Sequence, residues 1–125
     1  VDDAFLEALK GTGTDVSDTT YAAETYDAVI LAALAAEQGG SASGETIQKN
    51  LASVSGADGG EQCDSFQACK ALIDDKKKIQ YSGKTGIGAF NENNDPSSAN
   101  IGIYAYDDKN VNVFQAMQSG DVPSE

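Results

Sequence analysis

Two cysteines are the first candidates for chemistry, because the chain has no others and has no histidine. Cys63 and Cys69 are separated by five residues. Within one helix they would lie about 9 Å apart along the axis, at a rise of about 1.5 Å per residue, too far for a disulfide. Cys63, however, precedes the candidate helix cap Asp64 and follows Gly59-Gly60, so the chain could fold back. From the residues alone a disulfide and two free thiols both stay open, and a metal site is disfavoured because two thiols lack further ligands.

Two loop motifs could suggest binding of a phosphate or of calcium. Gly83-Lys-Thr85 ends like a phosphate-binding loop, but Lys78 stands where that motif requires its first glycine, and a strand is expected to follow instead of a helix. Asn91-Glu-Asn-Asn-Asp95 offers oxygen ligands, but Pro96 and Gly102 replace the glycine and glutamate that a calcium loop needs. We therefore predict no phosphate loop at the first motif and a plain turn at the second.

The carboxylates show no arrangement typical of catalysis. Glu24 and Asp27 lie three residues apart, on one face of a predicted helix, without a partner base or nucleophile in sequence. The absence of histidine removes the commonest general base. We predict that the pair is solvated helix surface and that the protein is not an enzyme and needs no cofactor.

The charge of the chain excludes two classes of partner. Eight Lys and Arg against twenty Asp and Glu give a net charge of -12. Such a chain cannot neutralise a row of phosphates, so nucleic acid is excluded, and an anionic membrane surface is equally unfavourable.

The first three fifths of the chain is predicted to be mainly helical. The central element is an alanine-rich helix over Thr20–Glu37, with Asp18, Thr19 and Thr20 as caps and Gly39-Gly40 as its end. Spacings of three and four predict that its buried face consists of Tyr26, Val29, Ile30, Ala33 and Leu34. Three further helices are expected, each with one apolar side, at Val1–Lys10, Glu45–Ser53 (capped by Ser43) and Ser65–Asp75 (capped by Asp64 with Gln67).

The last part of the chain changes to the two-residue period of strands. Short strands are predicted at Ile79–Tyr81 and Ile87–Phe90, followed by a turn over Asn91–Ser98. A hairpin is predicted from Ile101–Tyr106 and Val111–Gln115, with a frayed tail at Ser119–Glu125. The helices have more apolar surface than four short strands can cover, so part of the fold is expected to be missing.

The order of these pieces resembles the carboxy-terminal part of a known receptor family. The segments that carry the resemblance are Tyr21-Ala-Ala-Glu-Thr-Tyr-Asp-Ala-Val29, Ile79-Gln-Tyr-Ser-Gly-Lys-Thr-Gly86, Phe90-Asn-Glu-Asn-Asn-Asp-Pro96 and Ile101-Gly-Ile-Tyr104. They are similar to the branched-chain amino acid binding proteins, the extracytoplasmic substrate-binding proteins of ABC importers, and the similarity runs from about Phe5 to Phe114. Asn91 and Asn94 depart from it, since the family often has Asp and Gly there.

The resemblance implies an α/β fold: a fragment of a two-lobe type I periplasmic-binding-protein fold. Residues 1–93 would belong to the first lobe, 94–100 would cross the hinge, 101–118 would form a hairpin of the second lobe, and 119–125 would be a tail. Tyr21 and Ala23 would face the ligand cleft, where Ala23 leaves room for the ligand's apolar end. An extracytoplasmic, oxidising location, reached through a signal peptide not present in this chain, would favour a disulfide between Cys63 and Cys69.

The implied function is capture of branched-chain or related small amino acids or amides, and delivery of the ligand to an ABC permease by cleft closure. Two alternatives remain: a ligand-sensing receptor domain of the same fold, and an independent acidic interaction module. The groups that hold the ligand's ammonium and carboxylate in the family lie earlier in the family's chain. The isolated chain is therefore expected not to bind these amino acids tightly. It is also expected either to self-associate, by exchange of its terminal hairpin in a symmetric dimer, or to exist only as a proteolytic remnant held by the rest of its parent.

Overall fold

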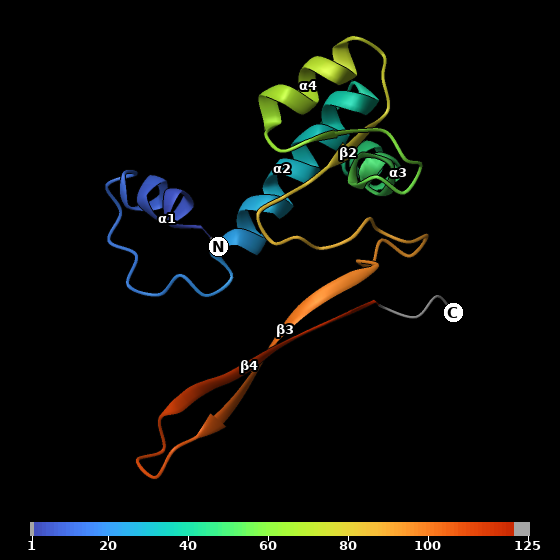
Figure 1. Cartoon of the computed structure of the whole chain (residues 1–125). Coiled ribbons are helices and arrows are strands. Elements are labelled where there is room, and N and C mark those ends of the chain that lie inside the picture. Colours follow the sequence, from blue (N-terminus) through green and yellow to red (C-terminus); the bar gives the residue numbers. More distant parts are fainter. Residues whose placement is uncertain (1, 122–125) are drawn as a thin grey trace.

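The computed structural model describes residues 2–121, and these form a mixed α/β structure. Figure 1 shows helices α2, α3 and α4 packed together and α1 set apart from them. The long hairpin of β3 and β4 lies below the helices in this view. The described elements are, in order, α1 (Asp3–Lys10), α2 (Ala22–Gly39), α3 (Gly44–Ser55), β1 (Glu61–Cys63), α4 (Phe66–Asp74), β2 (Ile79–Tyr81), β3 (Ser98–Tyr106) and β4 (Asn112–Asp121). None of the described helices is long and apolar enough to cross a membrane.

Helix α2 is the centre of the core, as predicted, but its buried face overlaps the predicted one only in part, at Leu34 and at the partly buried Ile30 and Ala33. Leu34 is fully buried as expected, whereas Tyr26 is 39% exposed and Val29 is 63% exposed. The buried residues of α2 are Ala23, Asp27, Leu31, Leu34 and Ala35, and the helix packs against α3 and α4. The prediction failed because an alanine-rich helix is apolar on nearly every side, so the spacing of large side chains does not select one face.

The start of α2 also differs from the prediction. The helix begins at Ala22 after Tyr21, whose φ of 61° is left-handed and whose side chain makes no capping hydrogen bond. Asp18 accepts a hydrogen bond from the Thr20 amide at 2.8 Å, within the preceding loop. This contact is local to the loop, so the predicted caps at residues 18–20 do not cap α2.

Helix α1 was predicted from Val1, and the described helix begins at Asp3. The Asp2 carboxylate accepts a hydrogen bond from the Phe5 amide at 2.7 Å and so caps the helix. Val1 lies outside the described residues.

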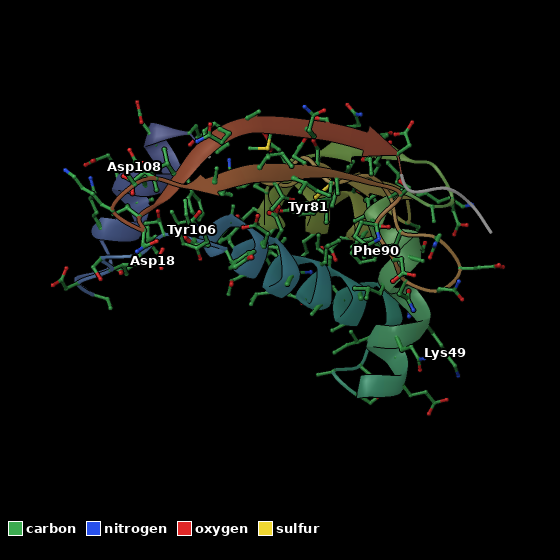
Figure 2. The ribbon with its side chains drawn as sticks, turned by 90° about the horizontal axis from the view of Figure 1, so that it is seen from below. Asp18, Lys49, Tyr81, Phe90, Tyr106 and Asp108 are labelled. Atoms are coloured by element: carbon green, nitrogen blue, oxygen red, sulfur yellow. A yellow bond between two sulfur atoms is a disulfide. The ribbon has the colours of Figure 1, made fainter. Side chains whose placement is uncertain are left out.

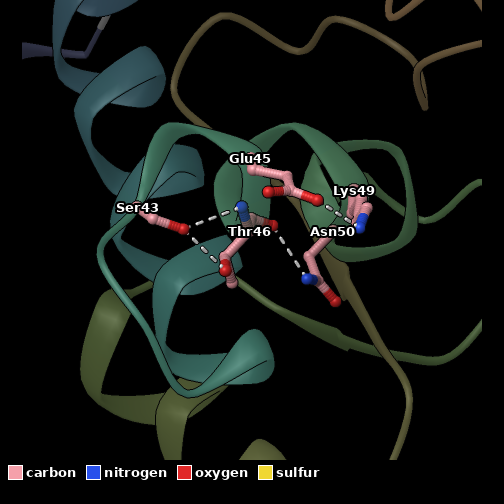
Figure 3. A network of polar contacts seen from close by, with 5 residues as sticks. All are labelled: Ser43, Glu45, Thr46, Lys49 and Asn50. Atoms are coloured by element: carbon pink, nitrogen blue, oxygen red, sulfur yellow. Dashed lines mark hydrogen bonds and ion pairs between the residues drawn. The ribbon is translucent and has the colours of Figure 1, made fainter.

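Helix α3 begins at the predicted cap. Figure 3 shows Ser43 Oγ accepting a hydrogen bond from the Thr46 amide at 3.2 Å, while the Lys49 ammonium pairs with Glu45 at 2.7 Å one turn further on. Val54 is fully buried in the core, and Ile47 and Leu51 pack against it. A serine oxygen for the orphan amides and a single apolar side are the features that made this helix predictable.

Strand β1, helix α4 and strand β2 form one parallel strand–helix–strand unit. Cys63 lies opposite Tyr81 in the register, and the strands cover only three residues each. Strand β1 was not predicted, since Glu61-Gln62-Cys63 lacks the alternating apolar residues that Ile79 and Tyr81 provide in β2. It can approach β2 because Gly60 has φ of 145° and a Cβ there would come within 2.6 Å of the Ile79 backbone. Ser65 caps α4 by accepting from the Ala68 amide at 3.4 Å, in place of the predicted Asp64 and Gln67.

The predicted strand at Ile87–Phe90 is wrong. Phe90 makes only an isolated bridge with Pro96, and its amide donates to Ser55 Oγ at 2.8 Å. The amide is thus taken by a side chain and is not available to a neighbouring strand. The following turn is confirmed over residues 91–95, with the Asn91 side-chain oxygen accepting from the amides of Asn93 and Asp95, but its predicted last residue, Ser98, belongs to β3.

The hairpin is confirmed and is longer than predicted. Strands β3 and β4 pair from Ser98–Asp121 to Tyr106–Asn112, and their main contacts are with each other. Figure 2 shows Tyr106 and Asp108 at the far tip of the hairpin, away from Phe90. Residues 119–121, predicted as part of a frayed tail, belong to β4, and residues 122–125 lie outside the described part.

Candidate functional site

The first turns of α2 meet the loop that leaves β2 at a single buried carboxylate, Asp27. One carboxylate oxygen accepts hydrogen bonds from the Tyr81 hydroxyl and the Lys84 amide, both at 2.9 Å. The other accepts from the Thr85 amide and the Thr85 hydroxyl, both at 2.8 Å. Four donors therefore hold a side chain that is only 2% exposed.

These neutral donors stabilise the charge of Asp27. Within the described residues, Asp27 forms no ion pair. Gly83 permits the close approach, since a Cβ there would overlap the Asp27 carboxylate. The two successive amides of the loop thus bind an anion, and that anion is internal to the protein. We call Asp27 with Tyr81 and the 83–85 loop the Asp27 clamp.

Burial is the main cause that raises the pKa of Tyr81 above its ordinary value, and its hydrogen bond to Asp27 adds to this effect. Tyr81 therefore stays a neutral donor to Asp27 at physiological pH. The hydroxyls of Tyr81 and Thr85 both donate to the carboxylate, and the clamp fixes the 83–85 loop to α2.

The prediction that Asp27 is solvated surface is wrong. Glu24 is exposed, whereas Asp27 is buried on the face that carries Leu31 and Leu34. The spacing from Asp27 to Leu31 to Leu34 to Ala35 is helical and therefore indicates the buried face. A carboxylate, however, interrupts the apolar pattern from which a buried face is predicted. Ser55 was also missed, and it anchors the next part of the same segment through the Phe90 amide.

The two residues expected at a ligand cleft lie at the first turn of α2 with different exposure. Tyr21 is 71% exposed. Ala23 is 1% exposed, so its methyl group is enclosed by the described residues. Both lie within two turns of the Asp27 clamp in sequence.

Cys63 and Cys69 form a disulfide, with Cα atoms 5.2 Å apart. The bond joins the end of β1 to the buried side of α4, because the chain folds back at Asp64. Disulfides of this kind are typical of oxidising, extracytoplasmic compartments. In the described residues no group of three or more Cys, Asp or Glu side chains could hold a metal ion.

Comparison with protein families, curated proteins and solved structures found no match to this chain.

Proposed function

We propose that the chain is the carboxy-terminal part of an extracytoplasmic substrate-binding protein of an ABC importer, with branched-chain or related small amino acids or amides as ligand. The sequence resemblance suggests this function. The structural observation that supports it is the Asp27 clamp, which fixes the first turns of α2 beside the carboxyl end of the parallel strand β2. Open α/β folds bind ligands at the carboxyl ends of their strands.

In this proposal, Tyr21 supplies an apolar surface for the ligand and the clamp keeps it in place. A side chain at the first turn of a helix holds a fixed position only if the helix start is fixed. Here no side chain caps α2, and Asp27, less than two turns along, ties the helix to the β2 loop instead. Closure of the parent receptor around the ligand would then favour the state that docks on the permease.

The test uses the full-length parent protein with leucine, isoleucine, valine and small amides, measured by calorimetry. We expect saturable binding, and we expect Tyr21→Ala to weaken it about tenfold through loss of apolar contact. Because Tyr21 is exposed, the Tyr21→Ala variant should unfold at the same temperature as the unsubstituted protein. The proposal fails if the folded parent binds none of these ligands, or if Tyr21→Ala leaves every affinity unchanged.

A further inference from the structure

A groove between α1 and the start of α2 is a second site of ligand size. It has a volume of about 570 Å³, within the range of small-molecule sites. Its walls are mostly apolar and come from both helices: Ala4, Phe5, Ala8 and Leu9 from α1, with Ala22 and Tyr26 from α2.

Aromatic contact holds the two walls together. The rings of Phe5 and Tyr26 meet edge to face, with centroids 5.5 Å apart. No residue of α1 is buried, although Phe5, Leu6 and Leu9 share its apolar side. The apolar side of α1 therefore borders the groove while it is only partly covered.

Among the described residues, Lys84 is the only cation that lines the groove. Its backbone amide is fixed by the Asp27 clamp, so the base of the side chain is held in place. Its ammonium makes no ion pair with a carboxylate of the described residues, although the chain carries a net charge of -12. An unpaired ammonium beside an apolar wall is suited to an anionic head group on an apolar tail.

The remaining polar groups of the groove limit where such a head group can lie. Thr12 and Thr25 add hydroxyls, and Asp2 adds a carboxylate whose Oδ1 already caps α1. Like-charge repulsion keeps an anionic head away from Asp2, so Lys84 is the place for it.

We propose that this groove binds an aliphatic carboxylate, with the carboxylate at Lys84 and the alkyl chain along the apolar walls beside the Phe5–Tyr26 contact. The inference goes beyond the proposed function and does not depend on it, because both walls belong to this chain. It assigns Lys84 as the residue that selects the charge of the ligand.

Three probes of equal chain length test the proposal on the 125-residue chain: decanoate, decanol and decylammonium, each below the concentration at which it forms micelles. Amide chemical shifts in nuclear magnetic resonance spectra give both the affinity and the location. A strongly acidic protein attracts a cationic amphiphile non-specifically, so a preference for decanoate over decylammonium isolates the effect of Lys84. We expect that preference, with shifts concentrated at residues 2–12 and 22–26.

Variants separate charge from apolar contact. Lys84→Ala should weaken the binding of decanoate about tenfold, the usual effect of losing one charge-assisted contact, and should leave the affinity for decanol unchanged. Lys49→Ala is the control, because it removes another exposed lysine, on α3 and outside the groove, and should change neither. Phe5→Ala should weaken both decanoate and decanol.

Three results would overturn the proposal. The first is decylammonium that binds as tightly as decanoate. The second is an equal decanoate affinity for Lys84→Ala and Lys49→Ala. The third is a set of shifts that maps to the exposed apolar hairpin of β3 and β4 and not to the groove.

Discussion

Replacing Asp27 by asparagine tests whether the buried carboxylate organises the β2 loop. The side chain keeps its size and loses its charge and one acceptor. Because Tyr81 and Lys84 donate to one oxygen and Thr85 donates twice to the other, the new amide nitrogen must face the donors of one side. If it faces Thr85, the hydroxyl can rotate to accept, but the Thr85 amide is left without an acceptor.

The expected cost follows from the bonds that are lost. Hydrogen bonds to a charged group contribute about 1.5–3 kcal/mol each, and Thr85 is only half-buried, so we expect Asp27→Asn to lower the free energy of unfolding by about 3 kcal/mol. For a chain of this length the melting temperature should fall by about 10 °C. Urea titration followed by circular dichroism measures the free energy directly.

Glu24→Gln is the matched control, with the same change of charge one turn earlier on the same helix. Since Glu24 is exposed, it should change the free energy of unfolding by less than about 0.5 kcal/mol. If Asp27→Asn behaves like Glu24→Gln, Asp27 is solvated and the reasoning about the clamp is refuted.

The remaining predictions concern the disulfide, alkaline pH, ligand binding and assembly. Replacing Cys63 and Cys69 by serine should cost about 2 kcal/mol, because the closed loop is short, and two alkylatable thiols in native protein would contradict the bond. The raised pKa of Tyr81 means that its stabilising effect is complete below pH 10, the value for an unfolded tyrosine, and is lost as pH rises further. In urea titrations, Tyr81→Phe should reduce the fall in the free energy of unfolding above pH 10. An unchanged dependence on pH would contradict this prediction. Calorimetry should detect no tight binding of leucine, isoleucine or valine by the isolated chain, and micromolar affinity would contradict this. Sedimentation should show a dimer at micromolar concentration, and a cooperatively melting monomer would oppose it.

Helices with a local start signal and one apolar side could be predicted from the sequence, and α3 is the clearest case. Its cap is Ser43, and its buried side begins with Ile47. The start of α2 could not be predicted in the same way. Its first residue follows Tyr21 in a left-handed conformation, and nothing about a tyrosine favours that conformation. The determinant is tertiary: Asp27 ties the helix to a loop more than fifty residues later.

The Asp27 clamp could not be predicted from the sequence for the same reason. An aspartate in an alanine-rich helix is normally solvated, and its burial depends on the donors that the 83–85 loop supplies. The error at Ile87–Phe90 is related, since its alternation of apolar residues and glycine matches a strand. The amide of Phe90 instead donates to the buried Ser55. Long-range polar contacts decided both segments, and no local pattern encodes them.

The hairpin carries the strongest structural argument that other chain segments normally surround it. Cross-strand partners share a face, so one face carries Tyr104, Phe114 and Met117 and the other carries Ile101 and Ile103, all at least 45% exposed. Apart from Asp121 at its end, neither strand has a charged residue.

An antiparallel sheet with one solvated face alternates apolar with polar residues, and a strand buried on both faces does not. A two-stranded hairpin is also marginally stable alone. The hairpin therefore fits a middle layer of a larger structure, with additional strands at its edges and cover on both faces. In the proposed receptor the second lobe would supply these. In a solution of the isolated chain, the hairpin of a second copy can pair with these strand edges along their whole length. This is the physical basis of the predicted dimer.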